Sequence, residues 1–172
     1  GSGVIHAGAY DELRRVAELL QSPVTTSWAG RGVLPETHEC AVPMPYVKLN
    51  HEVRNDADLV LCVGSRLGET DWWGKAPYWR HPSQQQMIQV DLDGLILGAN
   101  KPAALAVQAD ARVFLAALAQ ELEGRRGRMN LDARRRKLAK YHDTMRAERA
   151  KLDEKLADLA VPMNPAHLAA TC

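Results

Sequence analysis

One glycine, one arginine and several aspartates stand at the carboxyl ends of segments that we predict to be strands. In a parallel α/β sheet, ligands settle at the carboxyl ends of the strands, where helix N-termini present free N–H groups that favour anions. An arginine guanidinium can bind phosphate through two parallel hydrogen bonds, and a carboxylate can accept hydrogen bonds from ribose hydroxyls. These residue types therefore suit a phosphate-bearing nucleotide. The predicted cofactor-binding residues are Gly3, Gly64, Ser65, Arg66, Asp91, Asp93 and Asp110.

The same residues also have simpler structural interpretations. Gly64 can serve only to turn the chain after its strand, Arg66 can pair with a neighbouring acid, and Asp110 can cap a helix. Residues 1–6 do not complete a Gly-x-Gly-x-x-Gly pattern, because His6 stands where the third glycine would be. The sequence therefore disfavours a nicotinamide cofactor, and it leaves both a bound nucleotide and a purely structural domain open.

The elements that must position these residues follow from the hydrophobic pattern. The uninterrupted apolar run at 58–64 is typical of a central parallel strand. We predict a second strand of this kind at 86–91 and a weaker third at 105–109. Helices are predicted over 9–20, over 46–55 and from Asp110 onward, with short β-prone segments at 23–27 and 40–42. Strands separated by helical segments predict an α/β fold with a doubly wound, Rossmann-like parallel sheet.

The sign of the charge changes near Gly124. Residues 1–123 hold 10 Lys and Arg against 15 Asp and Glu, whereas residues 124–172 hold 12 against 6. Beyond the change, a narrow apolar stripe predicts a long charged helix, and Asn164 and Pro165 can cap and begin another. We therefore predict a globular domain over 1–123, a basic linker helix over 124–161 and the start of a truncated domain over 162–172.

Several other classes of protein are disfavoured. Cys40, Cys62 and Cys172 are widely spaced, and neither a Cys-x-x-Cys nor a His-Glu-x-x-His pattern indicates a metal site. The basic cluster over 125–140 lacks the aromatic platform of a nucleic-acid site. No run of eighteen apolar residues suggests a membrane span. We expect a cytoplasmic protein without nucleic-acid or membrane partners.

Three of the four tryptophans lie close together between Glu69 and Trp79. Such a cluster can stack an adenine or an acyl-CoA, or it can form a contact with another domain or subunit. We favour the contact.

Five motifs occur in the order found in the middle domain of thiamine-diphosphate enzymes of the acetolactate synthase and pyruvate oxidase class. They are Gly1-Ser2-Gly3 before a helix, Pro23 to Thr26 followed by Gly30 to Glu36, Ala57 to Arg66, Ile88 to Asp93, and Gln108 to Arg112. Residues 1–123 therefore resemble that domain, and 162–168 resembles the lead-in to the family's diphosphate-binding domain.

The resemblance implies a parent enzyme that uses thiamine diphosphate and Mg²⁺ as a lyase, decarboxylase or synthase on 2-keto acids or related carbonyl compounds. In that family the chemistry lies between the two outer domains, so this chain is expected to bind no thiamine diphosphate and to contain no catalytic residue. It would serve as a scaffold that contacts other domains and subunits of a homo-oligomer. In some relatives, counterparts of Arg66, Asp91, Asp93 and Asp110 lie along FAD or an ADP moiety. The alternative is a freestanding NAD- or FAD-binding module.

One departure from the family pattern has a structural consequence. Family members carry a strand just before the first glycine, which is central in the order 3-2-1-4-5-6. In this sequence that first strand is missing, so its neighbours would expose unpaired backbone groups, each costing ~1 to 3 kcal/mol if buried. We expect the gap to be filled by shifted pairing, by a swapped segment or by dimerisation.

Overall fold

A computed structural model describes residues 1–157, Pro165 and His167. The chain forms two compact units, residues 1–138 and residues 139–172, and each is described by itself. The elements are α1 (Ser2–His6), α2 (Tyr10–Leu20), α3 (Val47–Asp56), β1 (Leu59–Val63), β2 (Gln86–Asp91), β3 (Leu105–Gln108), α4 (Ala111–Arg125) and α5 (Asp132–Leu156). Short 3-10 turns lie at Trp28–Gly30, Glu69–Gly74, Gly94–Ile96 and Arg126–Arg128.

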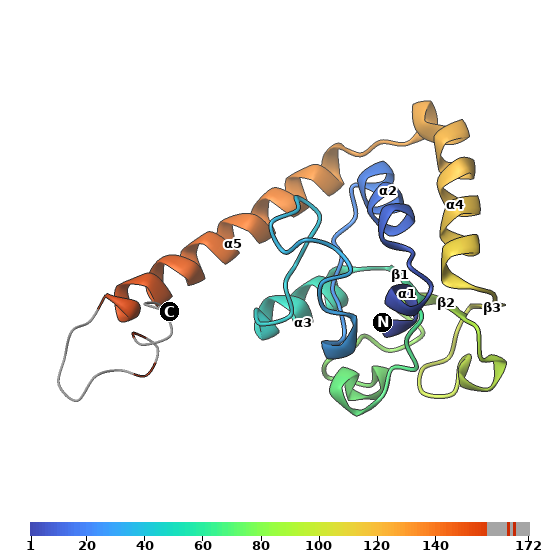
Figure 1. Ribbon diagram of the computed structural model, residues 1–172, viewed down its shortest axis with the longest axis horizontal. Helices are drawn as coiled ribbons and strands as arrows, with labels where there is room; N and C mark the ends of the chain where they lie inside the picture. The colour runs from blue at the N-terminus through green and yellow to red at the C-terminus, as the bar shows by residue number, and fades with distance from the viewer. Residues whose placement is uncertain (158–164, 166, 168–172) are drawn as a thin grey trace. The chain divides into compact units, whose positions relative to one another are not determined.

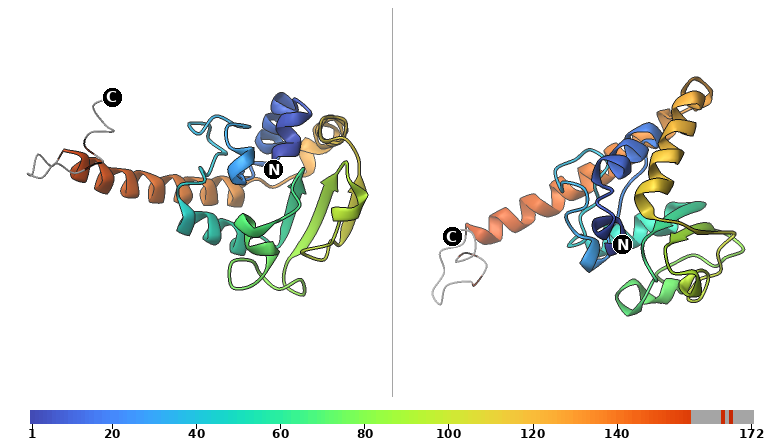
Figure 2. Two further views of the ribbon diagram at one scale, coloured as in Figure 1. Left: turned by 60° about the horizontal axis from the view of Figure 1, so that its bottom comes forward. Right: turned by 45° about the vertical axis from the view of Figure 1, so that its right-hand side comes forward.

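The first unit is built on a parallel sheet with the strand order β1-β2-β3. The register pairs Leu61 with Ile88 and Val90 with Val107. All three strands therefore end at one edge of the sheet, as the left view of Figure 2 shows. The predicted α/β fold with a parallel sheet is confirmed, and its three strands begin at or within one residue of the predicted positions.

Helices α2 and α4 pack on each other and cover one face of the sheet (Figure 1). Their buried residues form one cluster with side chains of all three strands, among them Val63, Val90 and Leu115. The other face packs against a smaller cluster that contains Met87 and Trp79. Apolar cover on both faces explains why β1 is a continuous apolar run rather than an alternating one.

The segments at 23–27 and 40–42 meet in a single parallel bridge, Val24 to Ala41, and not in a full strand pair. Within the described chain, β1 is an edge strand, because β2 is its only sheet partner. The gap expected beside β1 is therefore present, and no shift of pairing within the described residues fills it.

Helix α4 ends at Arg125 and α5 begins at Asp132, so the basic segment predicted as one linker helix starts with a turn and a break. The beginning of α5 belongs to the first unit, where Leu138 packs against Leu34 and Cys40. The predicted new domain over 162–172 lies outside the described residues, apart from Pro165 and His167. None of the described helices is both long and apolar enough to cross a membrane.

The two described cysteines are buried and free. Burial raises the pKa of Cys40 to about 11 and the pKa of Cys62 to about 12. Both thiols are therefore protonated at neutral pH, and they pack as apolar side chains.

Candidate functional site

The carboxyl end of β1 turns tightly against the start of α1. The N–H of Gly3 donates a hydrogen bond to the carbonyl of Gly64 at 3.1 Å. Gly64 has a φ of 59°, and a Cβ built on it would lie 2.6 Å from the Cα of Gly3. Only glycine allows both this left-handed conformation and this approach of two backbones. The structure thus brings two predicted residues, Gly3 and Gly64, into direct contact.

Ser65 continues from this turn toward a buried ion pair. Its hydroxyl accepts a hydrogen bond from the N–H of Leu67 at 3.2 Å and donates to Oδ2 of Asp71 at 3.4 Å. Oδ1 of Asp71 lies 4.0 Å from Nη1 of Arg54, and the two side chains are only 12% and 10% exposed. Nε of Arg54 also donates to the carbonyl of Asn50 at 3.1 Å.

Burial dominates the electrostatics of this pair. It lowers the pKa of Arg54, although Asp71 acts in the opposite direction. It raises the pKa of Asp71, and Arg54, the terminal amine of Gly1 and the Ser65 hydroxyl offset only part of that shift. Both directions favour the neutral forms, so the cost of removing these charges from water exceeds their mutual attraction.

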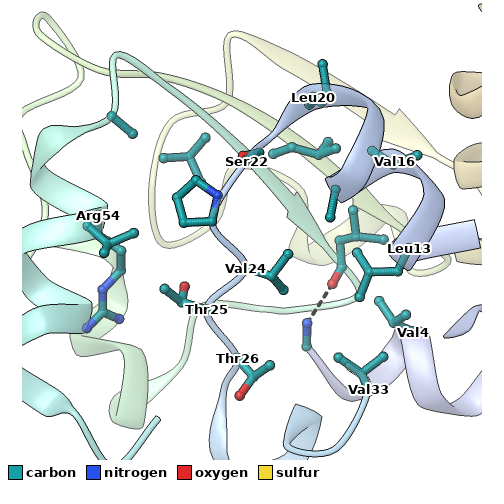
Figure 3. Close-up of a pocket in the computed structure, with 18 of the residues that line it drawn as sticks. Val4, Leu13, Val16, Leu20, Ser22, Val24, Thr25, Thr26, Val33 and Arg54 are labelled. Carbon is teal, nitrogen blue, oxygen red and sulfur yellow. Dashed lines mark hydrogen bonds between the residues drawn. The ribbon is translucent and has the colours of Figure 1, made fainter. Parts of the chain in front are cut away.

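Three cavities meet at Arg54. One of about 80 Å³ is lined by Ser65, Asp71 and Trp79 among others, and one of about 240 Å³ by Trp28 and Trp72 among others. A third, of about 210 Å³, lies along β1. Figure 3 shows the third cavity, with the Arg54 side chain at its margin.

The other predicted residues lie at the rim of the sheet and outside the lining of these three cavities. Asp91 accepts a hydrogen bond from the N–H of Asp93 at 3.1 Å, and Asp93 accepts one from the N–H of Leu95 at 2.9 Å. Asp110 caps α4 through the N–H groups of residues 112 and 113. Asp110 therefore has the helix-capping role that we considered for it.

Arg66 is exposed, and none of the carboxylates within residues 1–157 lies within salt-bridge distance of it. The pairing with a neighbouring acid that we considered for this residue is not formed there. Its guanidinium is available to a ligand at the same rim as Asp91.

The tryptophan loop is largely occupied within the chain. Trp79 is 5% exposed, and its Nε1 donates to the carbonyl of Asp71 at 2.8 Å. Trp72 stacks on Tyr78 with 4.4 Å between the ring centroids, and the Arg54 guanidinium lies between Trp72 and Trp79, 5.2 and 5.1 Å from their centroids. Trp73, at 45% exposed, is the member of the loop left for an outside contact.

Comparison with known proteins places this arrangement in a family. Residues 1–118 match the family model described as "Thiamine pyrophosphate enzyme, central domain". The chain belongs to the thiamine pyrophosphate enzymes. It is 33% identical to the sulfoacetaldehyde acetyltransferase of Castellaniella defragrans over 133 residues, which are 72% of this chain and 21% of that protein. It is 28% identical to the acetolactate synthase large subunit of Corynebacterium glutamicum over 174 aligned positions, covering 94% of this chain and 26% of the relative.

A solved structure agrees with this membership at the level of the fold. An X-ray structure from Mycobacterium smegmatis, assigned as a thiamin diphosphate-dependent enzyme, aligns with a TM-score of 0.54 at 23% identity. The alignment covers 70% of this chain and 23% of that one. The chain spans about a fifth to a quarter of the length of the curated relatives named above.

Thiamine diphosphate is the cofactor named in the description of the family. In the part of the chain that the structure describes, no three His, Cys, Asp or Glu side chains gather in a group that could hold a metal ion.

Sequence reasoning missed the polar centre of this thiamine pyrophosphate enzyme domain, the pair of Arg54 and Asp71. Arg54 follows the buried Leu49 and Val53 on α3, and a lone arginine beside such residues was the available signal. Nothing in the sequence indicated that it would reach a residue 17 positions further along the chain. That contact depends on the tertiary fold.

Proposed function

We propose that this chain is the central scaffold domain of a thiamine-diphosphate- and Mg²⁺-dependent lyase, decarboxylase or synthase that acts on a 2-keto acid or a related carbonyl compound. In this proposal the chain catalyses nothing alone, and it contacts other domains and subunits of a homo-oligomer. The observation that carries the proposal is the match of residues 1–118 to the central domain. The activities of the two relatives named above, an acetolactate synthase and an acetyltransferase, support this range of reactions.

The chemistry of the site also supports a scaffold. Asp91, Asp93 and Asp110 each use Oδ1 to hold a turn or a helix N-terminus. Asp71 is buried beside Arg54 and Ser65, and its main-chain carbonyl anchors Trp79. These contacts order the carboxyl end of the sheet, and they require no reacting group.

The scaffold role predicts that the isolated chain does not respond to thiamine diphosphate. A ligand present at about 100 times its Kd stabilises a folded protein by about 2.7 kcal/mol. Millimolar thiamine diphosphate with Mg²⁺ is therefore expected to leave the thermal midpoint of residues 1–172 unchanged and to give no binding heat in calorimetry. A saturable heat would contradict the scaffold assignment.

An adenine nucleotide site is a second candidate function, and the exposed Arg66 favours it. Arg66 has no carboxylate partner in the described chain, and it shares a rim with the carboxylates of Asp91 and Asp93. An ADP moiety, free or as part of FAD, offers the phosphates and ribose hydroxyls that these groups can bind.

Arg66→Ala is expected to weaken ADP binding about tenfold or more, because a hydrogen bond to a charged group contributes roughly 1.5 to 3 kcal/mol. Calorimetric titration of ADP, FAD and NAD into both proteins measures this effect. Arg14→Ala is the matched control, since Arg14 is also exposed but lies on α2 beside Asp11. Equal ADP affinity in all three proteins would rule out the rim site, whereas tight NAD binding would favour a freestanding nucleotide-binding module.

A further inference from the structure

The tryptophan loop, residues 69–79, is docked on one face of α3. Three side chains of that helix, His51, Arg54 and Asn55, stand three and four positions apart and therefore share a face. Nδ2 of Asn55 donates to the carbonyls of two loop residues, at 3.4 Å in each case. Arg54 reaches the loop through its buried ion pair with Asp71. His51 provides the third contact.

The imidazole of His51 lies against the two stacked rings of the loop. Its centroid is 4.4 Å from that of Trp72, with the ring planes at 81°, and 4.8 Å from that of Tyr78. Its Nε2 is buried, and it has no hydrogen-bond partner in the described part of the chain. The imidazole therefore holds the loop by ring packing and not by a hydrogen bond from this nitrogen.

Protonation would change the character of this contact. In an imidazolium both ring nitrogens are donors and the ring is cationic. Nε2 of His51 would then belong to a buried cation and would be a donor without an acceptor, which is unfavourable. Burial lowers the pKa of His51, and the charge of Arg54 adds to that shift. The docked loop therefore favours the neutral ring.

An attraction between an imidazolium and the Trp72 ring would act in the opposite direction. The Arg54 guanidinium already lies over that ring, 5.2 Å from its centroid. A second cation beside Trp72 would therefore be repelled by the first, and the net effect of protonation still opposes docking.

Charged groups on both packed elements act on His51. Arg54 and Asp71 are the buried ones, and the Asp71 carboxyl is already placed beside the Arg54 guanidinium. The other charged side chains of the two elements are more exposed, so water and salt screen them more strongly. They are Lys48, Glu52 and Asp56 on α3 and Glu69 and Lys75 in the loop.

The loop also carries backbone strain that its contacts must offset. Trp72 and Trp73 have φ values of 51° and 49°, in the left-handed region that is unfavourable for residues other than glycine. Residues in this conformation persist only where the surrounding contacts hold them. Weakening of the His51 contact therefore favours release of the loop.

We propose that His51 is a pH switch for the tryptophan loop: the neutral imidazole holds the loop on α3, and protonation releases it. Because the docked loop favours the neutral ring, the ratio of docked to released loop falls as the pH drops below the ordinary histidine pKa of about 6.5, by up to about tenfold per pH unit.

Release changes the surface that the chain offers. The rings of Trp72 and Tyr78 become exposed beside Trp73, so the aromatic surface available to another domain or subunit is larger at acidic pH. This consequence rests on the proposed scaffold role, whereas the release is a property of this chain alone.

Nuclear magnetic resonance of residues 1–172 from about pH 8 to about pH 5 tests the switch. Nuclear Overhauser contacts between the His51 and Trp72 rings are expected to disappear with the midpoint at which the imidazole of His51 titrates. The amide signal of Val90, buried in β2, is expected to stay unchanged. Ring contacts that persist after His51 has titrated would overturn the proposal, as would a simultaneous change at Val90, which would indicate unfolding of the whole chain.

His51→Phe is the matched variant, because it keeps an aromatic ring and removes the titrating nitrogens. Its loop is expected to stay docked over the whole pH range. His81→Phe is the control, since His81 is exposed and interacts with Ser83 rather than with the stacked rings. It should leave the midpoint of the parent unchanged. Release of the loop at acidic pH in His51→Phe would contradict the proposal.

Asp71→Asn separates the imidazole from the neighbouring carboxyl. The variant is expected to retain the pH-dependent release, and loss of the release would assign the switch to Asp71 instead. His51→Phe is also the background for pH measurements on the pair of Arg54 and Asp71, because it removes the imidazole that is coupled to Arg54.

Discussion

Gly64→Ala is expected to lower the free energy of unfolding by about 3 kcal/mol or more. A non-glycine residue at a φ of 59° carries roughly 1 to 2 kcal/mol of left-handed strain. The new Cβ would also lie 2.6 Å from the Cα of Gly3, and overpacking of this kind costs about 1 to 3 kcal/mol. The neighbouring atoms are backbone, so no side-chain rotation can relieve the contact. Denaturant unfolding followed by tryptophan fluorescence measures the loss.

Gly8→Ala is the matched control for backbone strain. Gly8 has a φ of 60°, nearly that of Gly64, but no heavy atom lies within 4 Å of its ideal Cβ. Its replacement is expected to cost only the roughly 1 to 2 kcal/mol of strain. The difference between the two variants isolates the contact between the end of β1 and the start of α1. Equal losses would show that this contact is looser than the structure indicates.

The strands could be predicted from the sequence because burial on both faces leaves a strong local signal. The run from Asp58 to Gly64 contains β1, Leu59–Val63, and β2 has the predicted bounds, Gln86–Asp91. A strand covered on both faces is mostly apolar, so its pattern does not depend on distant residues. The helix predicted over 9–20 could also be predicted from a local signal, because its apolar residues repeat at helical spacing.

Features that depend on distant contacts could not be predicted. Helix α1 has only five residues and includes Gly3, so its sequence has no helical pattern. The tryptophans of the loop looked alike in the sequence, yet Trp79 is buried while Trp73 is 45% exposed. In the candidate site, Asp110 could be predicted because helix capping is a local interaction. Asp71 could not, because its environment is assembled from α3 and from the end of β1.

Arg54→Met is expected to lower the free energy of unfolding by about 3 kcal/mol, because removing one member of a buried ion pair leaves the other charge uncompensated. The Asp71 carboxyl, 12% exposed, would keep the Ser65 hydroxyl but lose its nearest cation. Asp71→Asn is expected to cost less, about 1 to 2 kcal/mol. In that variant Arg54 keeps its bond to the carbonyl of Asn50 and its place between two tryptophan rings.

The double variant Arg54→Met with Asp71→Asn completes the cycle. Residues in direct contact are not additive, so the double variant is expected to lose less stability than the sum of the single losses, by about 1 kcal/mol or more. Urea unfolding of the parent and the three variants at pH 7 provides the four free energies. Strict additivity would show that the 4.0 Å separation is too long for an effective pair.

The pH dependence of the same four free energies identifies the group that causes the loss of stability in Arg54→Met. Burial raises the pKa of Asp71 in the folded chain, and Arg54 opposes that shift, so the Met variant should raise it further. A carboxyl whose folded pKa lies above its unfolded pKa contributes most stability below the unfolded value and loses it as the pH rises through the folded value. The loss of unfolding free energy caused by Arg54→Met is therefore expected to become smaller as the pH falls from 7 toward the acidic range. The loss of unfolding free energy that Arg54→Met causes in the Asp71→Asn background should not change with pH. If the loss in the Asp71 background is the same at pH 7 and at acidic pH, the Asp71 carboxylate does not carry the penalty.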